Sequence, residues 1–154
     1  MKKLESMLMC FLLAVNSILA QVGIQQNKTQ LSIKNEFTEL RFNMDKGTYS
    51  TINLLTGQEY LTDASFLIES VSSLDTFLRY SWKEESVTDN IGIGKKLVIT
   101  GSKSGLPDVI FGVSMYNGKT FIILNCGVNN ITAYPVTLKE FHPLIGKKIF
   151  LEGK

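Results

Sequence analysis

Apolar and polar residues alternate most clearly on the two sides of Asn117-Gly118, between residues 108 and 129. Asn-Gly between two apolar runs is the strongest short-range signal for a two-residue β-hairpin turn, because both turn positions need positive φ. With Tyr116 opposite Lys119, such a turn places six residues on one face, paired as Val113 with Ile122, Phe111 with Leu124 and Val109 with Cys126. The opposite face carries both polar and apolar residues. This stretch therefore predicts the centre of an antiparallel sheet with one apolar face.

A third strand is expected to follow this hairpin. Asn129-Asn130 offers a second turn, and residues 132–141 place Val136 and Leu138 on one face. Pro135 lacks the N–H that a central ladder position requires, so it argues against such a position. Residues 108–143 thus predict a three-stranded meander.

The rest of the chain shows further short runs of strand-forming residues separated by turn residues. An earlier hairpin is predicted to turn at Asp45-Lys46-Gly47. The remaining strand candidates cover residues 31–36, 40–44, 48–55, 64–71, 77–87 and 97–100. About nine strands and no convincing amphipathic helix favour an antiparallel β-sandwich over alternating βα units. We therefore predict an all-β fold with one sandwich domain over residues 31–145.

Residues 1–20 have the layout of a secretory signal peptide. Lys2 and Lys3 precede a short apolar region over residues 7–19, and Ala20 ends it on a small residue. The apolar run is shorter than the roughly 20 residues that span a bilayer, and a buried or membrane-anchored helix is the alternative. We predict cleavage after Ala20, a secreted or periplasmic location, and a loose, flexible leader over residues 21–30.

Length, charge and cysteine content limit the class of protein. The 154 residues suit one domain with a substantial core, and 44% hydrophobic with 19% charged residues does not fit a disordered chain. A formal charge of +2 is too small to indicate a nucleic-acid or anionic-membrane partner. After signal cleavage Cys126 is the one remaining cysteine, so no internal disulfide is expected and stability must come from packing.

Few residues are available for catalysis. His142 is the only histidine, which excludes a His-rich metal site or a pair of imidazoles, and no metal or other cofactor is predicted. Cys126 is expected to face inward and to behave as a small hydrophobe. The glycines of residues 92–94 and 101–105 lack the spacing of a dinucleotide or phosphate loop. The carboxylates that could pair for glycoside chemistry are expected to be solvated, and they are Glu59, Asp63, Glu84, Glu85 and Asp89.

Tyr80 and Trp82 are the candidate carbohydrate contacts. They share one side of the strand predicted over residues 77–87, and a row of aromatic rings can stack on sugar rings. The same row is more common in a protein core, so both interpretations stay open at this point. Asn27 and Asn130 begin Asn-X-Thr glycosylation patterns, which matter only in a eukaryotic secretory pathway.

The order of several motifs resembles a known family. Residues 42–49, Thr56-Gly57, residues 105–130 and residues 138–144 are similar to the N-terminal domain of secreted α-galactosidase-like glycosidases. These are the enzymes of glycoside hydrolase family 36 and its relatives, including the raffinose-synthase-like branch. The resemblance covers residues 31–144 and rests on structural motifs. It implies a supersandwich-like, galactose-mutarotase-like domain that packs on a catalytic (β/α)8 barrel absent from this chain.

The resemblance carries over no catalytic residue, because in these enzymes the barrel holds both catalytic carboxylates. Residues 146–154 are expected to be a truncated connection, at a point where the sandwich would still add strands or pass to the barrel. The leading hypothesis is therefore a non-catalytic domain that helps to shape a sugar cleft. A free-standing secreted carbohydrate-binding or surface-interaction module is the alternative, and a small self-contained enzyme is the third hypothesis.

Overall fold

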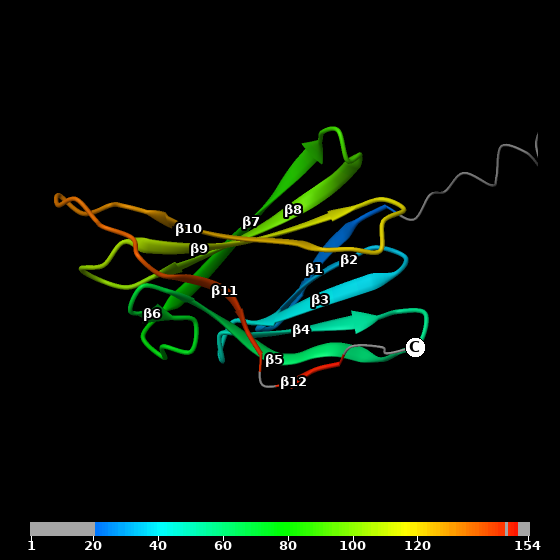
Figure 1. The fold of residues 1–154 in the computed structure, drawn as a ribbon, viewed down its shortest axis with the longest axis horizontal. Helices are drawn as coiled ribbons and strands as arrows, with labels where there is room; N and C mark the ends of the chain where they lie inside the picture. The colour runs from blue at the N-terminus through cyan, green and yellow to red at the C-terminus, as the bar shows by residue number, and fades with distance from the viewer. Residues whose placement is uncertain (1–20, 147, 151–154) are drawn as a thin grey trace, which may run out of the picture.

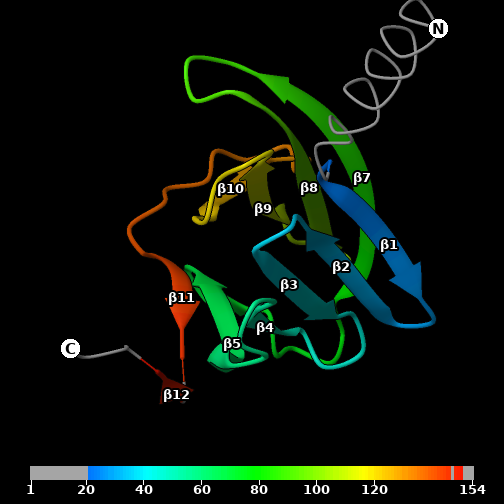
Figure 2. The same cartoon turned by 90° about the vertical axis from the view of Figure 1, so that its right-hand side faces the viewer.

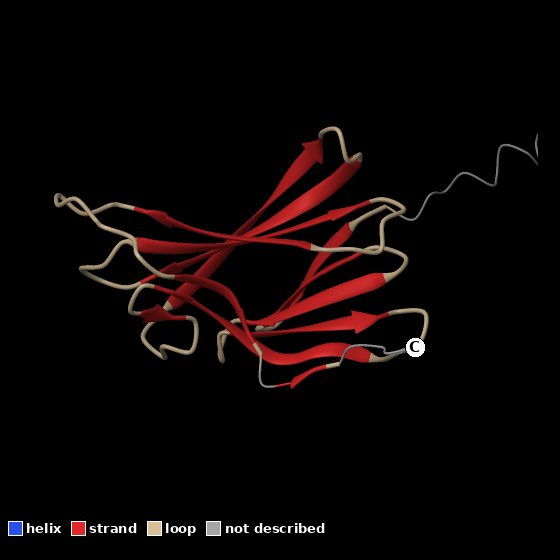
Figure 3. Cartoon of the chain, viewed as in Figure 1, coloured by secondary structure: helices blue, strands red, loops and turns tan. Residues whose placement is uncertain are grey.

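The computed structural model describes residues 21–146 and 148–150, and all regular elements in this part of the chain are strands. Figures 1 and 3 show the strands stacked in two layers. The larger sheet contains β1 (Gly23–Asn27), β2 (Gln30–Lys34), β3 (Thr38–Asn43), β4 (Thr48–Asn53), β5 (Glu59–Ile68), β6 (Val71–Ser72), β11 (Phe141–Ile145) and β12 (Lys148–Ile149). The smaller sheet contains β7 (Arg79–Thr88), β8 (Ile93–Ser102), β9 (Asp108–Tyr116) and β10 (Ile123–Asn129).

Both sheets are antiparallel. The larger sheet has the order β1-β2-β3-β4-β5-β11, with β6 and β12 also paired to β5, and the smaller sheet has the order β10-β9-β8-β7. Figure 2 shows β1 and β7 at one flank of the molecule and β10 and β11 at the other. The prediction of an all-β, antiparallel β-sandwich is confirmed. Within the described ranges, no helix is long and apolar enough to cross a membrane.

Aromatic rings fill the centre of the sandwich. The ring of Phe111 in β9 stacks on the ring of Phe66 in β5, with centroids 4.9 Å apart. Its centroid also lies 4.9 Å from that of Tyr49 and 6.3 Å from that of Phe42. All four residues are buried, and the three partners of Phe111 belong to the other sheet. This cluster therefore joins the two layers, as inward-facing residues of a sandwich core do.

The β9–β10 hairpin has the predicted apolar face but a different register. Val109, Phe111 and Val113 face the core, and Cys126 lies on the same face. Val113 pairs with Leu124 instead of Ile122, which is a shift of two residues along β10. A shift by an even number of residues keeps each side chain on its face, so the face was right although the partners were wrong.

The turn itself explains the changed register. The predicted turn at Asn117-Gly118 forms, since the Lys119 N–H donates to the Tyr116 carbonyl (3.3 Å) and Gly118 has a φ of +69°. Asn117 does not adopt positive φ and the second strand starts only at Ile123, so the prediction that these two residues alone close the hairpin is wrong. The Asn117 N–H donates to the Ile93 carbonyl (2.9 Å), and the Asn117 side-chain oxygen accepts the Val22 N–H (2.9 Å). The carbonyl of Lys119 accepts a hydrogen bond from Asn35 (2.7 Å), and residues 119–122 leave the ladder. Contacts with other parts of the chain thus override the local turn preference.

The predicted third strand of the meander is wrong. Residues 130–140, here called the strap, contain no strand and cross from the smaller sheet to the larger one, where β11 pairs with β5. Glu69 fixes the end of the strap, because its carboxylate accepts the N–H groups of Lys139 and Glu140 and its own N–H donates to the Glu140 carbonyl. The Tyr49 hydroxyl donates to the Pro143 carbonyl (2.6 Å) and holds β11 in place.

The loose leader predicted over residues 21–30 is also wrong, because Gly23–Asn27 forms the edge strand β1. β1 pairs with β2 along its whole length, from Gly23 opposite Lys34 to Asn27 opposite Gln30. Val22 just before it is buried, with 2% of its surface exposed. The polar side chains of β1 are exposed at the rim of the sheet, which is why the composition of this segment resembles a leader.

Most other strands lie where the alternation placed them, although several are longer. β5 begins at Glu59 and not at residue 64, and β8 runs from Ile93 to Ser102 where a four-residue strand was predicted. The β3–β4 hairpin turns at Asp45-Lys46-Gly47 as predicted, with Gly47 at a φ of +65°. The predicted signal peptide over residues 1–20 and the end of the predicted connection, residues 151–154, lie outside the described residues.

Asn35 ties the two sheets together at one end of the sandwich. It is 5% exposed, and its side-chain N–H groups donate to the carbonyls of Tyr116 (3.0 Å) and Lys119 (2.7 Å). Its side-chain oxygen accepts the backbone N–H groups of Phe37 and Thr38, both at 2.9 Å. One buried amide therefore satisfies four backbone groups, which explains why a polar residue continues the inward alternation after Ile33.

We expect Asn35→Ala to lower the free energy of unfolding by about 2–3 kcal/mol, because it leaves buried N–H and C=O groups without partners. Urea denaturation followed by tryptophan fluorescence measures this loss. Asn90→Ala is the matched control, since Asn90 is exposed in a turn, and its effect should stay below ~0.5 kcal/mol. Equal losses for the two variants would contradict the assigned role of Asn35.

Candidate functional site

Tyr80 and Trp82 lie on the inner side of β7. The Tyr80 ring packs edge-on against Phe42 with centroids 5.1 Å apart, and its hydroxyl donates to the Ser73 carbonyl (2.7 Å). The Trp82 indole N–H donates to the side-chain oxygen of Gln26 in β1 (2.8 Å). Both rings are half-buried and pack against the core. This arrangement favours the core interpretation, and the carbohydrate contact stays a prediction.

Trp82→Ala is expected to lower the free energy of unfolding by roughly 2 kcal/mol, because a half-buried ring loses its packing and its bond to Gln26. Leu55→Ala is the control, since Leu55 is 72% exposed. Titration of both variants with raffinose, followed by calorimetry, separates the two interpretations. Lost stability with unchanged saccharide binding rejects the ligand interpretation, whereas weakened binding at unchanged stability rejects the core interpretation.

Two of the candidate carboxylates pair with lysines of the smaller sheet. Glu84 and Glu85 lie on β7 beside lysines, with Glu84 3.4 Å from Lys95 and Glu85 2.8 Å from Lys83. Hydrogen bonding to Lys83 lowers the pKa of Glu85. A lowered pKa favours the ionised form, which is the opposite of what a general acid at neutral pH needs.

Asp89 has a structural role in the β7–β8 turn. It accepts hydrogen bonds from the Tyr116 hydroxyl (2.7 Å) and from the N–H groups of Ile91 and Gly92. These bonds, above all the one from Tyr116, lower the pKa of Asp89. Asp89 therefore fixes the turn as an ionised acceptor.

Glu59 and Asp63 both line a polar hollow of about 150 Å³ on the outer face of the larger sheet. Other residues of this hollow are Gln30, Arg41, Asn43, Lys46, Thr48, Tyr49 and Ser50. Arg41 is already engaged, since it forms an ion pair with Glu39 at 2.7 Å. The sequence did not indicate this grouping, because the hollow combines residues from the polar faces of several strands.

His142 and Cys126 do not come together as a nucleophile and base. His142 is exposed on β11 and its ring nitrogen lies 2.6 Å from the Glu140 carboxylate. Cys126 faces the core from β10, as predicted, and burial raises the pKa of its thiol to about 11. A thiol with a raised pKa is a poor nucleophile near neutral pH. The described residues hold no group of three or more His, Cys, Asp or Glu side chains that could bind a metal ion.

Both predicted glycosylation sites are exposed. Asn27 ends β1 at the turn into β2, and Asn130 begins the strap. The Asn130 side chain accepts a hydrogen bond from the Thr132 hydroxyl (2.7 Å) and donates to the Tyr134 carbonyl (2.8 Å). Attachment of a glycan to Asn130 would therefore have to compete with these local bonds, whereas Asn27 has no such restraint among the described contacts.

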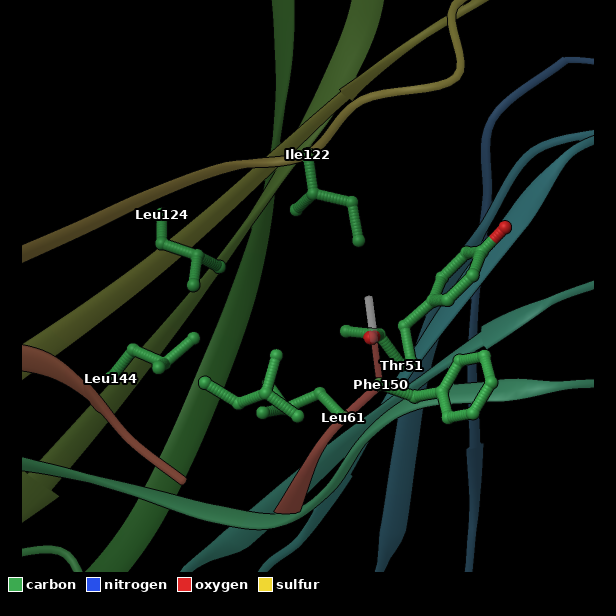
Figure 4. Close-up of a pocket in the computed structure, with 8 residues that line it drawn as sticks. Thr51, Leu61, Ile122, Leu124, Leu144 and Phe150 are labelled. Atoms are coloured by element: carbon green, nitrogen blue, oxygen red, sulfur yellow. The ribbon is translucent and has the colours of Figure 1, made fainter. Parts of the chain in front are cut away.

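An apolar hollow lies between the two sheets at the β10–β11 side. Its volume is about 440 Å³, and its lining is mainly apolar. Figure 4 shows Ile122 and Leu124 pointing into it from one side, with Leu61 and Leu144 opposite them. Ile149 and Phe150 complete its apolar wall. We call this space the flank hollow.

Exposed apolar side chains continue the flank hollow onto the surface of β11 and β12. Between 38% and 52% of each residue is exposed in this group, which consists of Phe141, Leu144, Ile145, Ile149 and Phe150. We call these five residues the β11–β12 surface. Leu144, Ile149 and Phe150 also line the flank hollow, and a group of exposed apolar residues marks an interaction site more often than single ones do. The sequence did not predict this group, because only the pairing of β11 and β12 with β5 brings the two strands to one flank.

Comparisons with known proteins add nothing to the structural description of the flank hollow and the β11–β12 surface. No protein-family model matches the sequence, no curated protein is significantly similar to it, and no solved structure matches its fold significantly.

Proposed function

We propose that this chain is the non-catalytic N-terminal β-sandwich of a secreted α-galactosidase-like glycoside hydrolase. In this role the sandwich packs against a catalytic (β/α)8 barrel of the full-length protein and shapes one side of the sugar cleft. The resemblance of the motifs suggests the family. The observation that carries the docking role is the β11–β12 surface beside the flank hollow. A signal peptide cleaved after Ala20 would deliver the protein to the periplasm or the outside of the cell.

The shape of the flank hollow supports docking by another folded unit. Its walls come from both sheets, with Leu124 on β10 and Leu61 on β5. A side chain inserted from outside would therefore contact both layers and add to the core. Burial of apolar area contributes roughly 25 cal/mol per Å², so covering five half-exposed apolar residues is a substantial driving force. A non-catalytic role also agrees with the lysine partners of Glu84 and Glu85 and with the turn-fixing role of Asp89.

The docking role predicts where the isolated protein binds an apolar dye. We expect the Leu144→Asp/Ile149→Asp variant of residues 21–154 to lose about half of the bound anilinonaphthalene sulfonate, because two charges interrupt the apolar surface. Leu55→Asp/Ile93→Asp is the control, since these residues are 72% and 64% exposed and lie outside this surface. Equal dye binding by the two variants would contradict a docking role for β11 and β12.

The same preparation tests the absence of catalysis. Residues 21–154 are expected to give no turnover of p-nitrophenyl α-galactoside, because both catalytic carboxylates are proposed to lie on the barrel. Measurable turnover that scales with protein concentration through purification would contradict the proposed non-catalytic role.

A second candidate function is a free-standing secreted carbohydrate-binding module. The polar hollow lined by Arg41, Glu59 and Asp63 favours it, because hydroxyl-rich ligands need both donors and acceptors. Saturable raffinose binding by residues 21–154, weakened by Asp63→Ala or Trp82→Ala, would support this function. Without such binding, the N-terminal domain of a glycoside hydrolase would remain the proposed function.

A further inference from the structure

The turn at Asn117-Gly118 contains a chemically labile pair of residues. Asn117 is the only asparagine of the sequence that is followed by glycine. In such a pair the glycine nitrogen can attack the side-chain carbonyl carbon of the asparagine, because glycine has no side chain that hinders ring closure and its backbone is the most adaptable. Gly118 is exposed, and its N–H donates to no backbone carbonyl among the described residues. The attacking group is therefore free.

The folded turn has the wrong shape for this attack. The Lys119 N–H donates to the Tyr116 carbonyl and closes the turn. Gly118 has a φ of +69° and Asn117 does not adopt positive φ, which identifies a type II turn. The first central residue of a type II turn has a ψ of about +120°. Ring closure on an L-asparagine needs a negative ψ, as in a type II′ turn, so Asn117 must leave its folded conformation before it reacts.

Two hydrogen bonds from distant parts of the chain hold Asn117 in that conformation. Its side-chain oxygen accepts the Val22 N–H (2.9 Å), and its own N–H donates to the Ile93 carbonyl (2.9 Å). Val22 is buried just before the edge strand β1, so the first bond lasts only while the start of β1 stays packed. A hollow of about 200 Å³ beside Val22 and Asn117 gives solvent access to the side chain. Reaction at Asn117 is thus coupled to the position of Val22.

We propose that Asn117 is a latent deamidation site, which the bond from Val22 protects while the start of β1 is in place. When Val22 moves away, the Gly118 nitrogen attacks Asn117 Cγ and gives up its proton to solvent. A C–N bond forms, the Cγ–Nδ2 bond breaks, and the amide nitrogen takes up a proton and leaves as ammonia. Water then opens the resulting succinimide ring at either carbonyl, which gives aspartate or isoaspartate at position 117.

The modification would weaken this end of the sandwich. Isoaspartate adds one methylene group to the main chain between Tyr116 and Lys119. The carbonyls of these two residues both accept hydrogen bonds from the buried amide of Asn35, which ties the two sheets together. Lengthening the main chain between the two carbonyls disturbs that tie. A brief opening at Val22 is therefore converted into a lasting change at the other sheet.

Peptide mass mapping of the purified protein over several weeks measures conversion at Asn117. Because two hydrogen bonds restrain the turn, we expect conversion in the folded protein to be at least about tenfold slower than in the same protein unfolded in guanidinium chloride. Val22→Pro removes the N–H that Asn117 accepts. Its conversion should be about fivefold faster than that of Val22→Ala, the matched variant that loses packing but keeps the N–H. Gly105→Ala, at a φ of +79° beyond the other end of β9, should lower stability and leave the rate unchanged.

Three results would overturn the proposal. These are equal conversion in the folded and the unfolded protein, equal conversion in Val22→Pro and Val22→Ala, and faster conversion of another asparagine than of Asn117 in the unfolded protein. Far-ultraviolet circular dichroism of each variant confirms the β-sandwich. Should Val22→Pro not fold, hydrogen exchange of the Val22 amide in the unmodified protein takes its place. Conversion must then rise in parallel with this exchange at low denaturant concentration, and conversion that does not follow the exchange would equally overturn the proposal.

Discussion

Phe111→Ala is expected to lower the free energy of unfolding by about 4 kcal/mol. Phe111 is fully buried and contacts aromatic rings of the opposite sheet, two of them with centroids only 4.9 Å away. Removal of a buried phenylalanine ring costs the transfer free energy of its atoms and leaves a cavity, typically 3–5 kcal/mol in total. Urea denaturation of the purified variant measures the loss.

Phe111→Leu is the matched variant for this prediction. Leucine fills part of the cavity, so we expect about half of the loss seen for alanine. Phe77→Ala serves as the exposed control, because 74% of Phe77 is exposed. If Phe111→Ala cost no more than Phe77→Ala, Phe111 would not lie between the two sheets.

Gly47→Ala is expected to lower the free energy of unfolding by roughly 3–5 kcal/mol, a loss similar to that of Phe111→Ala but with a different physical cause. Gly47 has a φ of +65°, and a Cβ at this position would lie 1.5 Å from the Ser73 carbonyl oxygen. The same Cβ would lie 2.9 Å from the Tyr80 hydroxyl, which donates to that carbonyl. Neither the turn nor the backbone at Ser73 can move without breaking this contact between β7 and the larger sheet.

Gly57→Ala separates the steric clash from the cost of positive φ. Gly57 has a φ of +72°, but a Cβ there meets nothing within 4 Å. We expect a loss of about 1 kcal/mol for Gly57→Ala, which reflects the backbone conformation alone. Thermal unfolding of both variants under the same conditions gives the difference. Equal losses would show that the Gly47 turn does not pack against Ser73.

Local patterns were sufficient to predict the fold class and the inward faces of the central strands. Alternation placed Phe111 and Val113 on the buried face of β9, and turn chemistry located the β3–β4 hairpin at Asp45-Lys46-Gly47. Each of these predictions depends on residues that are close in the sequence. The period of a strand then fixes which side chains share a face.

Contacts between residues far apart in the sequence determine the features that local patterns did not predict, namely the course of the strap and the position of β11. The course of the strap depends on Glu69, which holds Lys139 and Glu140 from 70 and 71 residues away. The position of β11 depends on Tyr49, whose hydroxyl donates to Pro143. Because β11 joins the larger sheet, Leu144 comes to face Leu124 across the flank hollow. The candidate docking site therefore could not be predicted from local alternation.

The proposed role beside a catalytic barrel is tested most directly by sequencing the natural transcript past the codon for Lys154. We expect the reading frame to continue with alternating strand and helix patterns and to include two carboxylates at the ends of barrel strands. A stop codon directly after Lys154 in the natural transcript would contradict that role, and the carbohydrate-binding module would then become the leading proposal.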